Sequence, residues 1–178
     1  VMEECGQKGV KSAAVITSGF GEVGDFETEE KLVEIAEKYN MPFIGPNIFG
    51  IVYAPTNLNA SFGPADVKPG KLAFITQSGA LGIALMGWTI TNKIGLSSII
   101  SVGNKAQIGE SELLENYLED DPNTKAILLY VEGLHDGKAS MDIFKKVGLK
   151  KPIIALKSGR SVRGAVAAAS HTGSLAGS

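Results

Sequence analysis

The stretch KLAFITQSGALG, residues 71–82, decides the fold. Its first half, Lys71 to Thr76, is a short and mainly apolar run. Ser78 and Gly79 follow as turn residues, and a long segment with few polar residues continues to about Asn92. A short apolar run that passes through a turn into a longer apolar segment predicts a strand, a tight turn and a helix.

The same alternation continues toward the C-terminus. We expect strands at residues 97–102, 126–131 and 153–156, and helices at residues 111–118 and 141–147. The last strand is a continuous apolar run after Pro152, which is typical of a parallel strand covered on both faces. Strands that alternate with helices pair in parallel through right-handed crossovers. We therefore predict an α/β fold in which residues 71–178 form a flavodoxin-like domain with a parallel sheet.

The residues before this domain repeat the pattern in a shorter form. A helix is expected to end at Gly9, a strand to follow at residues 13–16, a helix to begin at Thr28 and a strand to follow at residues 42–44. Residues 51–53 and 58–62 are expected to close this lobe as a pair of short strands. The strand–helix–strand order is half of a doubly wound domain. We predict a partial Rossmann-like lobe at residues 1–63 and a linker at residues 64–70, which contains two prolines.

Composition excludes several classes of protein. With 178 residues, of which 44% are hydrophobic and 20% charged, the chain can bury a core. A formal charge of −2 gives no reason to expect a nucleic acid or an anionic membrane as partner. The single cysteine, Cys5, excludes an internal disulfide and favours the reducing cytoplasm. No signal peptide is recognised, and no apolar run approaches the ~20 residues of a membrane span.

Polar residues gather where the predicted parallel strands end, and ligands of open α/β sheets bind beyond that edge. Gln77-Ser78-Gly79-Ala80 follows the first strand of the domain. The next three strands are followed by Asn104, Glu132 and Ser158-Gly159, and His171 lies further along the last connection. Residues from nearly a hundred positions are thus expected at one edge, and we predict a functional site there.

The helix start at Gln77 to Ala80 allows two interpretations. The first backbone N–H groups of a helix lack partners inside it, and with the helix dipole they attract an anion. Gly79 would let that anion approach the backbone closely. The simpler alternative is that Ser78 only caps the helix and Gly79 only forms the turn. The residues alone leave both open.

His171 and Glu132 form the sharper hypothesis. His171 lies among small residues, in SHTGSLAG at 170–177, and could act as nucleophile, base or metal ligand. Glu132 ends an apolar strand and could hydrogen-bond one imidazole nitrogen, leaving the other free to attack. A satisfied structural histidine and a solvated loop carboxylate are the alternatives. We set His135 aside, because Asp136-Gly137 after it suggests an exposed turn, and we predict no metal ligands, since no compact zinc spacing occurs.

Several motifs together resemble the nucleoside-diphosphate-forming acyl-CoA synthetases. This family includes the α subunit of succinyl-CoA synthetase and the ADP-forming acetyl-CoA synthetases. The motifs are SHTGSLAG, FITQSGALG at 74–82, GNKA at 103–106 and LYVEGL at 129–134. AVITSGFGEVG at 14–24 and PFIGPNIFGIV at 42–52 resemble the family's CoA-binding Rossmann domain. The resemblance covers essentially the whole chain. It implies a fragment, which lacks the first strand and glycine-rich turn and is truncated at its C-terminus.

The resemblance implies an acid–thiol ligase. Such an enzyme converts acyl-CoA, ADP and phosphate to a carboxylic acid, CoA and ATP through an acyl phosphate and a phosphohistidine. It implies His171 as the phosphorylated residue and Glu132 as the glutamate that orients it. The implied phosphate site is Gln77, Ser78, Gly79 and Ala80, and the implied CoA contacts are Thr17, Ser18, Gly19 and Asn47. Gln107 stands where relatives often carry Asp after GNKA, and it is assigned no role.

The resemblance also implies cofactors and partners. CoA and phosphate are expected on this chain, and Mg and ADP or ATP on an ATP-grasp partner, either a separate β subunit or a fused domain. An oligomer is expected. The main alternative is a regulatory CoA-synthetase-like module of a protein lysine acetyltransferase, but such modules have lost the histidine, and His171 and Glu132 argue against this. A flavodoxin-like flavin module is the other alternative, and it would lack aromatic stacking partners, since the one Trp88 falls within a predicted helix.

Overall fold

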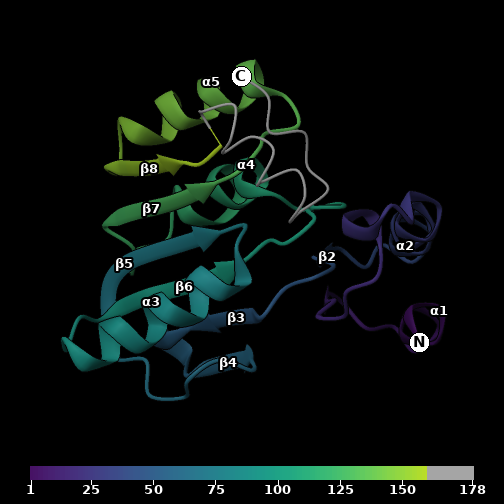
Figure 1. The fold of residues 1–178 in the computed structure, drawn as a ribbon, viewed down its shortest axis with the longest axis horizontal. Coiled ribbons are helices and arrows are strands. Elements are labelled where there is room, and N and C mark those ends of the chain that lie inside the picture. The colour runs from purple at the N-terminus through teal and green to yellow at the C-terminus, as the bar shows by residue number, and fades with distance from the viewer. Residues whose placement is uncertain (160–178) are drawn as a thin grey trace.

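A computed structural model describes residues 1–159 of the chain, and its main feature is a six-stranded sheet (Figure 1). The strand order is β4-β3-β6-β5-β7-β8. The four strands from β6 to β8 are parallel, which confirms the predicted α/β fold with a mostly parallel sheet. The strand bounds are β3 (Gly50–Tyr53), β4 (Leu58–Ser61), β5 (Pro69–Thr76), β6 (Leu96–Ser101), β7 (Ala126–Val131) and β8 (Ile153–Lys157).

Helices lie on both faces of this sheet, and side chains alternate between two cores. Ala73 and Ile75 of β5 belong to a core that includes Leu114 and Val147. Phe74, between them, belongs to the opposite core with Met86. The first core is covered by α4 (Glu110–Leu113), the π-helical turn η3 (Leu114–Leu118) and α5 (Gly137–Gly148), and the second by α3 (Gly79–Thr91).

The antiparallel edge of the sheet differs from the prediction. Residues 51–53 and 58–62 were expected to close the first lobe, and β3 and β4 do pair with each other. However, β3 also pairs antiparallel with β6, with Val52 opposite Ile99, so both strands extend the large sheet. Burial explains this, because Val52 joins the core on the α3 face and Ile51 packs against the other core. The sheet thus begins before residues 64–70, and the division into domains there stays a prediction.

The first lobe is a small unit beside the sheet edge. It comprises α1 (Met2–Gln7), β1 (Ala13–Ala14), the 3-10 turn η1 (Gly21–Val23), α2 (Phe26–Lys38) and β2 (Phe43–Ile44), and β1 and β2 pair in parallel. A second 3-10 turn, η2, spans Ala54–Thr56 between β3 and β4. No helix in residues 1–159 is long and apolar enough to cross a membrane.

Two helices begin earlier than predicted, because an aspartate caps each one. Asp25 accepts a hydrogen bond from the N–H of Thr28 at 3.1 Å, so α2 begins at Phe26 rather than at Thr28. Asp136 accepts one from Ala139 N at 2.9 Å and starts α5 at Gly137. Residues 135–137 are exposed, as expected, but Asp136 and Gly137 form a helix start rather than an isolated turn.

The loop after β6 attaches the first lobe to the sheet. The backbone N–H groups of Asn104 and Ala106 donate to the carbonyls of Pro46 and Gly45, each at 3.0 Å. Gln107, which the sequence left without a role, accepts a hydrogen bond from Phe43 N at 2.9 Å. Gly103 permits this approach, because a Cβ there would lie 2.2 Å from the oxygen of Pro46.

Candidate functional site

A cavity of about 430 Å³ lies where β5 and β7 end, facing the first lobe. The arrowheads of both strands point to this edge in Figure 1. The cavity brings together predicted site residues from four parts of the chain: Ser18, Asn47, Gln77, Ser78, Gly79, Ala80 and Glu132. Its apolar wall consists of Ile16, Ile48, Phe49, Phe62 and Ile83. Thr17 and Gly19 belong to the same loop as Ser18 but do not line the cavity.

The start of α3 is capped by a side chain, and some of its backbone N–H donors remain free. Ser78 is the N-cap, and its hydroxyl accepts a hydrogen bond from Leu81 N at 3.3 Å. The N–H of Ser78 itself donates to Thr76 Oγ1 at 3.0 Å. Because the first amides of a helix have no partner within it, those of Gly79 and Ala80 stay available at the cavity wall. An added Cβ at Gly79 would meet no atom within 4 Å, so a ligand has room there. Capping and an anion site are therefore compatible here.

Gln77 makes its hydrogen bonds within the protein. Its side chain is only 6% exposed. The amide oxygen accepts from the N–H groups of Glu132 and Gly133, at 2.7 and 3.0 Å. The amide nitrogen donates to Gly133 O at 2.7 Å and to the carboxylate of Glu110. Both donors of the side chain are used, which leaves Ser78 to Ala80 as the part of the predicted phosphate site that has free groups.

Glu132 is a buried carboxylate, and one of its oxygens has no hydrogen-bond partner in the described residues. It follows β7, is 5% exposed and lines the cavity. Its Oε2 has no hydrogen-bond partner within residues 1–159. Because an unpaired buried carboxylate oxygen is costly, we expect a donor from outside residues 1–159 to face it. His171, the donor that the sequence suggested, lies outside the described residues.

The loop that contains Thr17, Ser18 and Gly19 is tied to the sheet edge. Thr17 O accepts from Asn47 N at 2.9 Å, and the side-chain amide of Asn47 donates to Asn104 Oδ1 at 3.2 Å. Asn104 in turn donates to the carboxylates of Glu22 and Glu29, at 2.5 and 2.7 Å. Burial opposes ionisation of Glu22, but the hydrogen bonds from Asn104 and from three backbone amides outweigh it and lower the pKa of this carboxyl.

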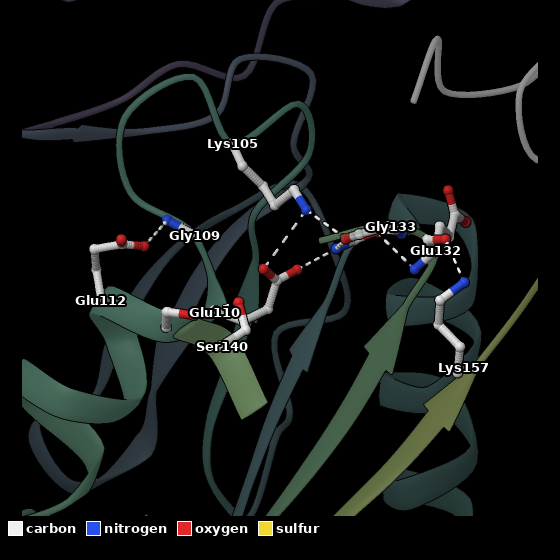
Figure 2. Close-up of polar contacts among 10 residues, drawn as sticks. Lys105, Gly109, Glu110, Glu112, Glu132, Gly133, Ser140 and Lys157 are labelled. Carbon is white, nitrogen blue, oxygen red and sulfur yellow. Dashed lines mark hydrogen bonds and ion pairs between the residues drawn. The ribbon is translucent and has the colours of Figure 1, made fainter. Parts of the chain in front are cut away.

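The sequence did not predict a group of charged residues near Glu132 and Gly133, which Figure 2 shows. Lys105, 8% exposed, donates to Gly133 O at 2.7 Å, and its Nζ lies 3.6 Å from Glu110 Oε2. Burial lowers the pKa of Lys105, although the nearby Glu110 carboxylate acts in the opposite direction. Lys157 donates to Glu132 O at 2.8 Å. GNKA was the only signal for Lys105, and no sequence pattern indicated that Glu110 is buried.

His135 lies apart from the cavity at β5 and β7. It lines a smaller cavity of about 180 Å³ with Asp136 and residues of α4 and α5. In the part of the chain that the structure describes, no group of three or more His, Cys, Asp or Glu side chains could hold a metal ion.

Residues 69–178 match the family described as succinyl-CoA ligase like flavodoxin domain. The chain belongs to this family. Across its whole length it is 64% identical to the α subunit of ADP-forming acetate–CoA ligase I from Pyrococcus furiosus. It is 52% identical, over 99% of its length, to the ADP-forming acetate–CoA ligase of Methanocaldococcus jannaschii. The chain spans 39% of the first relative and 25% of the second.

The family membership extends to a solved structure. Acetyl-coenzyme A synthetase 1 of Ca. Korarchaeum cryptofilum, in complex with phosphate and ADP, superposes with a TM-score of 0.94 and 57% identity, covering 100% of this chain and 39% of that chain. The resemblance stated from the motifs is thereby confirmed. The names of the family members favour a ligase over a regulatory module of an acetyltransferase.

Proposed function

We propose that this chain is the CoA-binding and histidine-bearing part of an ADP-forming acyl-CoA ligase. The observation that carries the proposal is the buried Glu132, whose Oε2 lacks a partner in the described residues and which lines the same cavity as the start of α3. A carboxylate acceptor and free backbone donors in one cavity suit a histidine that receives a phosphoryl group.

The chemistry follows in balanced steps. Phosphate oxygen attacks the thioester carbonyl, and CoA leaves as the acyl phosphate forms. A ring nitrogen of His171 then attacks phosphorus, so that an N–P bond forms while the bond to the carboxylate oxygen breaks and the acid leaves. ADP finally takes the phosphoryl group, which regenerates the imidazole and yields ATP.

Residues of this chain have separate tasks in these steps. The amides of Gly79 and Ala80, at the positive end of the α3 dipole, hold the phosphate oxygens. Glu132 accepts the distal N–H of His171, which fixes the tautomer and stabilises the positive charge that builds on the ring. Ser18 and Asn47, with Thr17 and Gly19 beside them, contact CoA. The apolar wall around Phe49 keeps water away from the acyl phosphate.

The ATP-dependent half of the reaction belongs to a partner. We assign ADP or ATP and Mg to an ATP-grasp subunit or fused domain, and we expect the complete enzyme to be an oligomer. A small carboxylic acid is the other substrate. The proposed compartment is the reducing cytoplasm, which the single free Cys5 supports.

Labelling tests this function. The full-length protein with its ATP-grasp partner is incubated with γ-labelled ATP, and the labelled residue is mapped. We expect an acid-labile, base-stable label on His171, lost in His171→Asn and retained in the matched control His135→Asn. Glu132→Gln is expected to slow labelling by about 10²-fold. A label that survives in His171→Asn, or maps to His135, would refute the proposal.

A further inference from the structure

The dipeptide Glu132–Gly133 has all its backbone polar groups bound by side chains. Gln77 Oε1 accepts from both N–H groups, at 2.7 and 3.0 Å. Gly133 O accepts from Gln77 Nε2 and from Lys105 Nζ, both at 2.7 Å. Glu132 O accepts from Lys157 Nζ at 2.8 Å (Figure 2). Loop backbone normally bonds to water or to other backbone, so this degree of side-chain control is unusual.

The three side chains lie at or after the ends of three different strands. Gln77 follows β5, Lys105 lies in the loop after β6, and Lys157 ends β8. The residue after β7 is thus held by the ends of the other three parallel strands. Glu110 joins two of these groups, because its carboxylate accepts from Gln77 Nε2 and lies 3.6 Å from the ammonium of Lys105.

Stability alone is a poor explanation for this arrangement. Burying an ammonium and a carboxylate costs desolvation free energy, and their electrostatic attraction often does not offset this cost. Lys105 and Glu110 are nevertheless 8% and 3% exposed. Fully satisfied buried polar networks do, however, fix a local geometry closely.

One of the three buried side-chain atoms without a hydrogen-bond partner among the described residues is functional in character. It is Oε2 of Glu132, in the cavity where the proposed reaction takes place. A fixed backbone restricts where this oxygen can point, and misplacement of a reacting group by about 1 Å can cost about 10²-fold in rate.

We propose that Gln77, Lys105 and Lys157 are positioning residues, which hold the Glu132–Gly133 backbone so that the Glu132 carboxylate is aimed at the phosphorylated histidine. This inference rests on the proposed function. The three side chains bind the main chain on either side of the carboxylate rather than the carboxylate itself. They therefore act through Glu132.

Lys157→Met is the primary test, because Lys157 is half-buried and its loss spares the core. Lys151 offers a matched control. It is also half-buried. The ammonium of Lys157 donates to two backbone carbonyls, those of Glu132 and Ser158, and the ammonium of Lys151 donates to those of Leu118 at 2.5 Å and Asp121 at 2.6 Å. Both substitutions therefore remove an equivalent set of hydrogen bonds, but only one set reaches Glu132.

The experiment uses the full-length protein with its ATP-grasp partner and measures single-turnover labelling from γ-labelled ATP. Lys157→Met is expected to slow labelling about tenfold. The KM for CoA should stay unchanged, and Lys157→Arg should recover most of the rate. Lys151→Met should label at the wild-type rate, with a shift in Tm similar to that of Lys157→Met.

A double-mutant cycle separates positioning from a general structural role. In the Glu132→Gln background, Lys157→Met should slow labelling less than about twofold, because the carboxylate through which it acts is gone. Equal slowing in both backgrounds, or equal rates for Lys157→Met and Lys151→Met, would overturn the inference and leave the proposed function standing. If Glu132→Gln alone labels at the normal rate, the role of Glu132 in the proposed function fails, and the inference fails with it.

Discussion

Two glycines in α3 provide a direct test of how this helix is seated. Gly82 is buried against β5 and Phe49, and a Cβ there would lie 2.3 Å from Phe49 Cε1 and 3.0 Å from Thr76 Cγ2. Gly87 lies in the same helix, and a Cβ there would meet nothing within 4 Å. Gly82→Ala and Gly87→Ala therefore share the gain in helix propensity and differ in the steric cost.

The magnitudes follow from these contacts. Replacing a helical glycine with alanine gains about 1 kcal/mol. Overpacking a filled site costs about 1–3 kcal/mol, and the ring of Phe49 is fully buried and held edge-on by Phe62. Gly87→Ala is thus expected to gain up to about 1 kcal/mol, and Gly82→Ala to lose up to about 2 kcal/mol. For a domain of this size, each kcal/mol shifts Tm by about 2–4 °C.

The same pair of variants tests the phosphate site. Phe49 lines the cavity that Gly79 and Ala80 face, so an α3 displaced by a Cβ at residue 82 should move those amides. Thermal unfolding of the full-length protein and the KM for phosphate are measured for both variants. Gly82→Ala should lower Tm and raise KM, and Gly87→Ala should raise Tm and leave KM unchanged. A Gly82→Ala protein that melts as high as Gly87→Ala would refute the packing described for α3.

Two further predictions concern the ion pairs and the CoA loop. Lys150 and Lys146 lie 2.6 and 3.5 Å from the carboxylate of Glu119, and the hydrogen bond from Lys150 lowers the pKa of Glu119 below its ordinary 4.5. The pKa of Glu119 is therefore higher in the unfolded chain than in the folded chain. The ionised Glu119 stabilises the fold fully at a pH above the unfolded pKa, and this stabilisation is lost as the pH falls through the folded pKa. Glu119→Gln should lower Tm at about pH 7, and its difference from the wild type should shrink in melts at about pH 3; a constant difference would contradict this. Asn104→Ala removes the donor that joins Glu22 and Glu29, so it should raise the KM for CoA several-fold while labelling from ATP stays normal, and an unchanged KM would argue against CoA binding at residues 17–19.

Local signals in the sequence predicted most of the parallel sheet. The apolar runs at residues 71–76, 97–102, 126–131 and 153–156 correspond to β5, β6, β7 and β8, because a strand buried on both faces needs apolar residues at successive positions. The helix starts were less accurate, since Asp25 and Asp136 act as caps several residues before the first apolar turn. The partner of β3 could not be predicted, because its pairing with β6 joins segments that are far apart in the chain.

The sequence indicated which residues lie near one another at the sheet edge, but not where each side chain points. The rule that ligands bind beyond the strand ends placed Ser78, Gly79 and Glu132 together, and they do line one cavity. The rule says nothing of where a side chain points. Gln77 was expected at the phosphate, yet its amide faces the backbone of residues 132 and 133. The sequence did not indicate that Lys105 and Glu110 are buried, since burial of a charge depends on contacts between distant segments.

The buried side-chain atoms without a hydrogen-bond partner differ in what they indicate about function. Within residues 1–159 they are Ser98 Oγ, Glu132 Oε2 and Ser158 Oγ. Ser98 lines the apolar cavity of about 560 Å³ formed by residues of β3, β6 and η3, where an unpartnered hydroxyl is a modest cost. An ionised carboxylate can only accept hydrogen bonds, so the unpartnered Oε2 of Glu132 requires a donor. Glu132 and Ser158 follow the neighbouring strands β7 and β8, and Lys157 bonds to the carbonyl oxygens of both. The two residues with unpartnered side-chain atoms are therefore adjacent along one sheet edge, and the same lysine contacts the backbone of both.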